Sequence, residues 1–150
     1  MARFRRTFVF HAMTLEQKFS VPAATRVVFT AADGKVGVLA GRSPLIAKIG
    51  IGPLVVSDKD GKQQEFFVAG GFARVYEEAT TVLADQFEAM DQIDPKEALD
   101  EIERIKAIPA RSAEEINAKT SRLAVAQARF NLVQKYRRRM AAKQPDTQPE

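Results

Sequence analysis

The sequence predicts an all-β sandwich of about ten strands, followed by a C-terminal antiparallel α-helical hairpin. Up to about Ala84, short runs of β-branched and aromatic residues alternate with Gly, Pro and Asp, which is typical of antiparallel strands. After Asp85, apolar residues recur every three or four positions, as on one face of a helix. Pro109 interrupts this second pattern, so two helices are expected. We therefore assign residues 1–86 to the sandwich, 87–143 to the hairpin and 144–150 to a disordered tail.

The strands are placed by the apolar runs and the turns by glycine. Asp33-Gly34 and Asp60-Gly61 are the best turn markers, because glycine supplies the positive φ of tight hairpins. Gly70-Gly71 lies inside a strand-like run, where a bulge or a close approach of strands is expected. The candidate strands are residues 8–13, 17–19, 25–31, 36–39, 45–49, 52–57, 63–68, 72–76 and 80–83.

Two capping signals place the helices. Asp94-Pro95-Lys96-Glu97 predicts a helix start, with an N-cap carboxylate, proline in the first turn and a glutamate that can complete a capping box. This helix should run to about Ala107. Ser112 and Glu115 form the same type of signal for a second helix that extends to about Lys143. The expected apolar stripes are Ala98, Leu99, Ile102, Ile105 and Ile108 on the first helix, and Ile116, Leu123, Ala126, Phe130 and Val133 on the second.

The two predicted helices carry opposite charge. Residues 85–104 contain eight acidic and two basic side chains, whereas residues 111–143 contain nine basic and two acidic ones. Antiparallel packing would bury the apolar stripes and bring the opposite charges together at the flanks. Because exposed ion pairs contribute only about 0.2–1 kcal/mol each, such a closed hairpin could open in favour of a better partner.

Composition excludes several classes of protein. The chain of 150 residues is 45% hydrophobic and 28% charged, values that are ordinary for a globular domain. Uninterrupted apolar stretches are too short for a membrane-spanning helix. Cysteine is absent, so disulfides and thiolate metal sites are excluded. The single His11 has no evident base or nucleophile partner, and no phosphate-binding Gly-x-x-x-x-Gly-Lys-Ser/Thr loop occurs. We expect no catalytic residues, no metal and no cofactor.

The N-terminus leaves two interpretations open. Residues 1–14 are basic and contain no acid, so an organellar transit peptide is one possibility. The alternation of Phe8, Phe10 and Ala12 with more polar neighbours favours the other, a first strand with a basic leader.

Three segments of the chain resemble one known family. Residues 33–45 resemble the Gly-Glu-x-Gly-x-x-Pro-Gly-His-x-Pro-Leu hairpin of ATP synthase epsilon subunits. Residues 66–75 are similar to the family's strand, glycine pair and strand, and residues 81–85 to the end of its sandwich. Gln92-Ile93-Asp94 matches the entry to its helical hairpin. The segments occur in the family's order, so the resemblance extends from Phe8 to about Arg139.

The resemblance implies a non-catalytic subunit of the central stalk, or rotor, of a proton-translocating F-type ATP synthase. In that family the sandwich binds the gamma subunit and the polar loops of the c-ring, so that ring rotation is coupled to the catalytic head. The residues that the resemblance places at this contact are Lys35, Gly37, Gly41, Arg42, Ser43 and Pro44. Lys35 stands where the family often has an acid, and Arg42 where it often has a histidine, so either less basic partner loops or simple solvent exposure of both cations is expected.

The family's helical hairpin can also extend into the catalytic head and block ATP hydrolysis. The basic residues that suit contact with the acidic region of the beta and alpha subunits here are Arg122, Arg129, Lys135, Arg137, Arg138 and Arg139. The alternative is a solvated basic face packed on the acidic first helix. Some bacterial relatives bind ATP at an Ile/Leu-Asp-x-x-Arg-Ala motif, of which this chain keeps Ile93, Asp94 and Ala98. Glu97 replaces the arginine, and a carboxylate would repel phosphate, so we expect no ATP binding.

A different function remains as an alternative. The arginine-rich second helix would also fit a nucleic-acid-binding protein on a β-sandwich scaffold, although no helix-turn-helix or aromatic single-strand platform is evident. The family resemblance favours no nucleic acid partner. It places the protein at the cytoplasmic face of the bacterial inner membrane, with an organellar location as the less favoured reading and membrane contact only through the complex.

Overall fold

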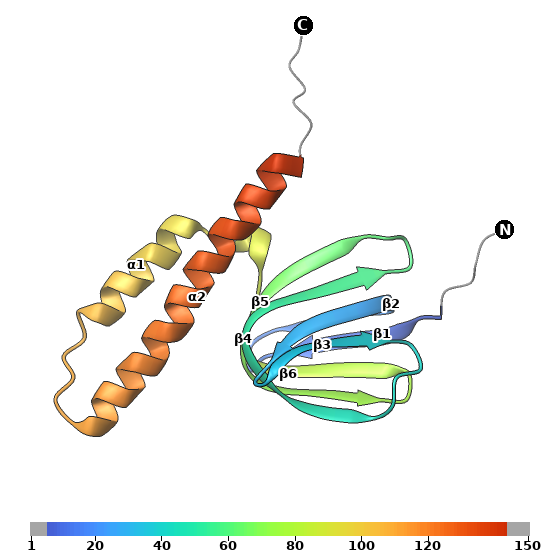
Figure 1. Ribbon diagram of the computed structural model, residues 1–150, viewed down its shortest axis with the longest axis horizontal. Helices are drawn as coiled ribbons and strands as arrows, with labels where there is room; N and C mark the ends of the chain where they lie inside the picture. The colour runs from blue at the N-terminus through green and yellow to red at the C-terminus, as the bar shows by residue number, and fades with distance from the viewer. Residues whose placement is uncertain (1–5, 144–150) are drawn as a thin grey trace, which may run out of the picture. The chain divides into compact units, whose positions relative to one another are not determined.

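The computed structural model describes residues 6–143, and the chain divides into two compact units. The first unit ends at Ala89 and the second begins at Met90, three residues beyond the boundary predicted at residue 86. Within the described residues the first unit consists of β-strands and the second of helices (Figure 1). The predicted tail, residues 144–150, and the N-terminal residues 1–5 with Arg3 and Arg5 lie outside the described residues.

The first unit is one sheet that closes on itself. Its strands are β1 (Phe8–Met13), β2 (Lys18–Ala31), β3 (Gly34–Leu39), β4 (Leu45–Asp58), β5 (Gln63–Tyr76) and β6 (Ala79–Ala89). Neighbouring strands follow the order β1-β6-β5-β4-β2-β3, and β1 also pairs with β2. The β1–β6 pair is parallel, and the other pairs are antiparallel. The predicted sandwich-like front part is therefore confirmed.

The prediction of about ten strands is wrong in its count, because the described residues form six longer strands. Residues 17–19 and 25–31, expected as separate strands, are parts of β2. Residues 45–49 and 52–57 join as β4, and residues 63–68 and 72–76 join as β5. Pairing continues on both sides of the segments that separate these runs, which are residues 20–24 in β2 and glycine-containing segments in β4 and β5.

Gly70 and Gly71 form the predicted irregularity inside β5. Both have positive φ, +74° and +106°, a region that residues with a side chain rarely adopt. A Cβ at Gly71 would also collide with the carbonyl oxygen of Leu83 and lie 2.8 Å from the Cα of Ala84 on β6. Glycine is therefore required here both by the backbone angle and by the close approach of the neighbouring strand.

The core of the sandwich follows from alternation along the strands. Phe8, Phe10 and Ala12 on β1 are buried, as the period-2 pattern predicted. Phe10 and Phe29 are completely buried. An aromatic group adds to this core, in which the rings of Phe66 and Phe87 stack with centroids 4.4 Å apart. These contacts give the first unit a hydrophobic core of its own.

The turns that connect the strands are local structures. Ala32 and Asp33 form the tight turn between β2 and β3, since Ala31 pairs directly with Gly34. Between β4 and β5, the side chain of Asp58 accepts hydrogen bonds from the backbone N–H groups of Asp60 and Lys62, both at 2.9 Å. Both turns predicted from Asp-Gly pairs are confirmed.

The second unit contains the short helix η1 (Met90–Gln92), α1 (Pro95–Lys106) and α2 (Ala113–Lys143). Asp94 caps α1 by accepting a hydrogen bond from the N–H of Lys96 at 3.0 Å. Ser112 caps α2 through the N–H of Glu115 at 3.1 Å, and the Glu115 carboxylate accepts a hydrogen bond from the N–H of Arg111 at 2.8 Å. Both helix starts are thus where the sequence placed them.

The two helices pack along a short apolar seam. Ile102, Ile105 and Ala126 form its buried part, and Leu123 and Phe130 are partly buried beside them. The predicted stripes are longer than this seam, because Leu99, Ile108 and Ile116 are 44%, 38% and 49% exposed. Ile116 lies in the first turns of α2, before the level at which Lys119 reaches the carbonyl of Lys106 at the end of α1. It therefore has no turn of α1 opposite it.

Candidate functional site

The loop between β3 and β4 gathers most of the predicted contact residues. Gly41, Arg42, Ser43 and Pro44 lie in this loop and are all exposed, and Gly37 is exposed within β3. The backbone N–H of Arg42 donates to the carbonyl of Leu39 at 3.2 Å, and its guanidinium Nη1 donates to the carbonyl of Gly37 at 2.9 Å. Arg42 thus ties its own loop back to β3 while it remains at the surface.

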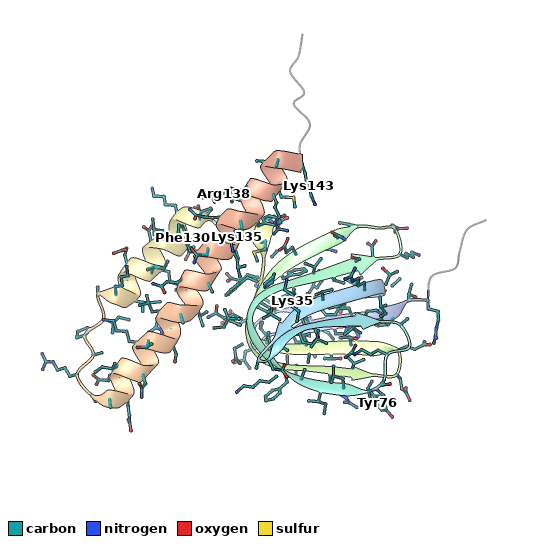
Figure 2. All side chains as sticks on the ribbon, viewed as in Figure 1. Lys35, Tyr76, Phe130, Lys135, Arg138 and Lys143 are labelled. Atoms are coloured by element: carbon teal, nitrogen blue, oxygen red, sulfur yellow. The ribbon has the colours of Figure 1, made fainter. Side chains whose placement is uncertain are left out.

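Lys35 lies apart from that loop. It is exposed on β3, opposite Thr30 of β2 and one residue from the turn (Figure 2). A third cation approaches the loop instead, since a Cβ at Gly41 would lie 3.1 Å from Nη1 of Arg6. Arg6 also faces Glu78 at 3.8 Å, with both side chains mostly exposed. The guanidinium group of Arg6 therefore lies beside Gly41, a contact that the sequence did not reveal.

An exposed apolar surface on the sheet was missed by the sequence reasoning. Ile46 on β4, Phe72 and Tyr76 on β5, and Leu83 on β6 are 74%, 58%, 49% and 55% exposed. We call these four residues the outer-face patch. Phe72 pairs directly with Leu83 and with Lys48, two residues from Ile46, so these side chains share one face of three neighbouring strands. The available signal was the presence of large apolar residues at the positions that alternate with the core.

The basic side chains of α2 fall into two groups. Arg122, Lys135 and Arg138 are exposed, and Figure 2 shows Lys135 and Arg138 on the C-terminal half of the helix. Arg129 and Arg137 are engaged with the first part of the hairpin. The Arg129 side chain is only 9% exposed and contacts Glu97 and Glu101 of α1.

Arg137 and Arg139 make further contacts within the second unit. Nη2 of Arg137 donates to the carbonyl of Ile93 at 3.2 Å. The guanidinium of Arg139 lies 5.9 Å from the centre of the Tyr136 ring, within the range of a cation–π interaction. The three consecutive arginines 137–139 therefore do not form one uniform basic surface, because Arg137 and Arg139 make different contacts within the hairpin.

The residues that this chain keeps from the ATP-binding motif of some relatives have structural roles in the hairpin. Asp94 caps α1, and the Ile93 carbonyl accepts the bond from Arg137. Ala98 is completely buried. Glu97, at the position of the motif's arginine, is directed at Arg129 at 3.0 Å and at Arg104 at 3.7 Å.

Among residues 6–143, no group of three or more His, Asp and Glu side chains could hold a metal ion. His11 donates to or accepts from the hydroxyl of Ser20 at 2.8 Å on the exposed side of β1. None of the helices in the described part of the chain has the length and apolar character needed to cross a membrane.

Comparison with known proteins defines the class. Residues 7–90 match the family model described as the β-sandwich domain of the ATP synthase delta/epsilon chain. The ATP synthase epsilon chain of Ruminiclostridium cellulolyticum is 33% identical over 117 residues, which cover 78% of this chain and 81% of that relative. That of Desulforamulus reducens is 33% identical over 129 residues, covering 80% and 92%. The chain belongs to the ATP synthase epsilon-chain family.

Solved structures agree with the fold. A chain of the Euglena gracilis mitochondrial ATP synthase, determined as an OSCP, F1 and c-ring assembly, superposes with a TM-score of 0.70. It is 16% identical, and the match covers 85% of this chain and 81% of that chain. A chain from the central stalk and c-ring of the Tetrahymena thermophila enzyme gives a TM-score of 0.60 at 14% identity, covering 88% and 97%. The family model and the epsilon-chain relatives confirm the family resemblance stated from the sequence.

Proposed function

We propose that this protein is a non-catalytic central-stalk subunit that couples c-ring rotation to the catalytic head through the gamma subunit. Family membership carries the proposal, and the outer-face patch supplies a physical basis for it. A rotor part must transmit torque without deforming, and the closed sheet with its buried aromatic core is suited to that task. The complex would place it at the cytoplasmic face of the bacterial inner membrane.

The outer-face patch is the surface we assign to the gamma subunit. Four large apolar side chains exposed on neighbouring strands are unusual on the surface of a monomer, and such a patch typically marks a protein interface. Phe72 pairs with Leu83 on one side and with Lys48 on the other, and Ile46 pairs with Arg74. Burial of an aromatic side chain of this size contributes about 1.5–3 kcal/mol. Arg74, which lies over the Tyr76 ring at 5.0 Å, stands among these apolar side chains and would supply a polar contact to the partner.

The β3–β4 loop is the surface we assign to the polar loops of the c-ring. Its exposed Ser43 and Pro44 follow Arg42, whose bond to the Gly37 carbonyl restrains the loop. Lys35 and Arg42 add positive charge, so the fitting partner loops carry acidic or neutral side chains. Charge reversal of Lys35 should weaken binding to the ring more at low salt than at high salt, because screening reduces the contribution of exposed charges.

The helical hairpin is proposed to inhibit ATP hydrolysis when α2 reaches the acidic surface of the beta and alpha subunits. The exposed cations Arg122, Lys135 and Arg138 are accessible for this contact. Arg129 contributes only after it leaves Glu97 and Glu101. ATP itself is not a proposed ligand, because the carboxylate of Glu97 occupies the position of the motif's arginine and repels phosphate.

Two experiments test this function. A tagged chain should capture the gamma subunit and the c-ring from a solubilised synthase, and should show no base-specific affinity for duplex or single-stranded DNA. Failure to capture gamma, together with specific DNA binding, would favour the nucleic-acid alternative.

The second experiment concerns inhibition. Addition of the chain to an alpha–beta–gamma head should lower the rate of ATP hydrolysis, and Arg122→Glu with Arg138→Glu should relieve the effect. Lys62→Glu, an exposed charge reversal in a sandwich turn, is the matched control and should leave inhibition intact. Equal inhibition by the parent and both variants would show that these cations of the hairpin do not cause the inhibition.

A further inference from the structure

Arg129 has the contacts of a clamp between the two helices. Its Nη2 donates to Oε2 of Glu97 at 3.0 Å, and its Nη1 donates to Oε2 of Glu101 at 3.1 Å. Glu97 and Glu101 are one helical turn apart, so their carboxylates lie on the same face of α1. The planar guanidinium can bind both at once, whereas a lysine ammonium would act as a single point charge.

This clamp is shielded from solvent on the side of the arginine. The Arg129 side chain is 9% exposed, and the side chains of Glu97 and Glu101 are 48% and 35% exposed. Charge-assisted hydrogen bonds with a partly buried member are stronger than pairs between fully exposed groups. The contact is therefore more than a solvated surface pair.

The α1–α2 contact also contains a buried apolar seam and other polar links. Its buried apolar seam consists of Ile102, Ile105 and Ala126. Two further polar links join the ends, from Lys119 to the Lys106 carbonyl at 2.9 Å and from Arg137 to the Ile93 carbonyl at 3.2 Å. Both involve a backbone carbonyl, so neither pairs opposite full charges.

We infer that Glu97 and Glu101 act as a latch on Arg129, which keeps the hairpin closed without a ligand and withholds this cation from acidic partners. To bind Arg129, an acidic surface on a partner has to replace the carboxylates of Glu97 and Glu101, which bind it in the closed hairpin. Opening of the hairpin toward such a surface is then an exchange of one set of charge pairs for another. This inference concerns the chain by itself and holds whether or not the hairpin inhibits hydrolysis.

The test measures the separation of the helices in the full chain. The sequence contains no cysteine, so Leu99→Cys on α1 and Asn131→Cys on α2, both at exposed positions, carry spin labels for pulsed electron resonance. The parent should give one short distance in low salt. Glu97→Gln with Glu101→Gln should raise the ratio of open to closed hairpin about tenfold or more, since each charge-assisted bond is replaced by a weaker one.

The matched control removes the same charge from the same helix. Asp100→Asn with Glu103→Gln changes two exposed carboxylates of α1 and should leave the distance distribution of the parent. Arg129→Glu combined with Glu97→Arg and Glu101→Arg reverses the charges of the latch while it keeps guanidinium groups as donors, and it should restore closure.

Several results would overturn the latch. One is a distribution of spin-label distances in the Glu97→Gln, Glu101→Gln variant that equals that of the parent. Another is that the Asp100→Asn, Glu103→Gln control opens as much as that variant. If the variant with Glu97→Gln and Glu101→Gln loses helical circular dichroism, Arg129→Lys is used for the test instead. Lysine keeps the positive charge but lacks the planar guanidinium that binds both carboxylates. A distribution for Arg129→Lys identical to that of the parent would also contradict the inference.

Discussion

Gly71→Ala should destabilise the sandwich strongly, because the glycine satisfies two separate requirements. Its φ of +106° is accessible to alanine only with strain, which costs about 1–3 kcal/mol. The added Cβ would meet the carbonyl oxygen of Leu83 and lie 2.8 Å from the Cα of Ala84. Since the obstacle is backbone, β5 and β6 have to separate locally, and the lost ladder bonds cost about 1 kcal/mol each.

The expected total is about 3 kcal/mol or more. For a domain of this size, each kcal/mol lowers the midpoint of thermal unfolding by about 4–8 °C. Scanning calorimetry of the full chain should therefore show the sandwich transition at least about 12 °C lower than in the parent.

Gly37→Ala is the matched control for this change. Gly37 has no atom within 4 Å of an added Cβ and no positive φ. Alanine there reduces the freedom of the unfolded chain and should stabilise the fold by about 0.4–1 kcal/mol. If Gly71→Ala unfolds within 2 °C of Gly37→Ala, the close approach of β5 and β6 at this bulge is not as described, and the reasoning is refuted.

Three other changes test different parts of the account. Phe29→Ala should lower the free energy of unfolding by about 3–5 kcal/mol in calorimetry, because this ring is completely buried; a loss under 1 kcal/mol would contradict the core. Ser112→Ala should cost the α2 start about 1 kcal/mol, seen as faster hydrogen exchange at the Glu115 amide, and unchanged exchange would argue against the cap. Arg42→Ala should speed amide exchange in its loop while stability changes by less than about 0.5 kcal/mol; a large loss of stability would show that the bond to Gly37 has a structural role beyond the loop.

The hairpin could be predicted to within a residue at its helix starts because caps are local. Asp94 and Ser112 select their positions through side-chain bonds to N–H groups two or three residues away. No knowledge of residues far along the chain is needed to predict these two helix starts. The length of the packed seam was less predictable, since it depends on where α1 ends opposite α2, and Ile116 was consequently placed in a stripe that does not extend so far.

The strand count was overestimated because local breaks in the apolar pattern, at residues 20–24 in β2 and at glycines in β4 and β5, do not end the strands. Asp33 precedes a glycine at a true turn, whereas Gly70 and Gly71 lie within β5 at a bulge. Only pairing with β6 distinguishes these cases. A strand that continues past an irregularity is held by partners far along the chain, and these partners are invisible to a local pattern.

The candidate site was predicted unevenly for a related reason. The resemblance led to the β3–β4 loop, where the structure places four of the six contact residues, Gly41 to Pro44, on one exposed segment. It gave no indication of the outer-face patch. Alternation predicts which residues point inward, but only the register of three strands shows that Ile46, Phe72 and Leu83 adjoin one another. Arg129 was expected either to meet a partner subunit or to belong to a basic face packed on the acidic first helix, and it is bound by two carboxylates of that helix.

Calorimetric titration of the chain with the gamma subunit tests the central claim most directly. The parent and Leu15→Glu should bind equally, because Leu15 is fully exposed in a turn of the sandwich and lies outside the patch. Phe72→Glu should weaken binding about a hundredfold or more, since it removes an apolar anchor and buries an unpaired charge. Equal affinity of Phe72→Glu and the parent, or no binding by the parent, would contradict a sandwich that docks on the rotor through its outer face.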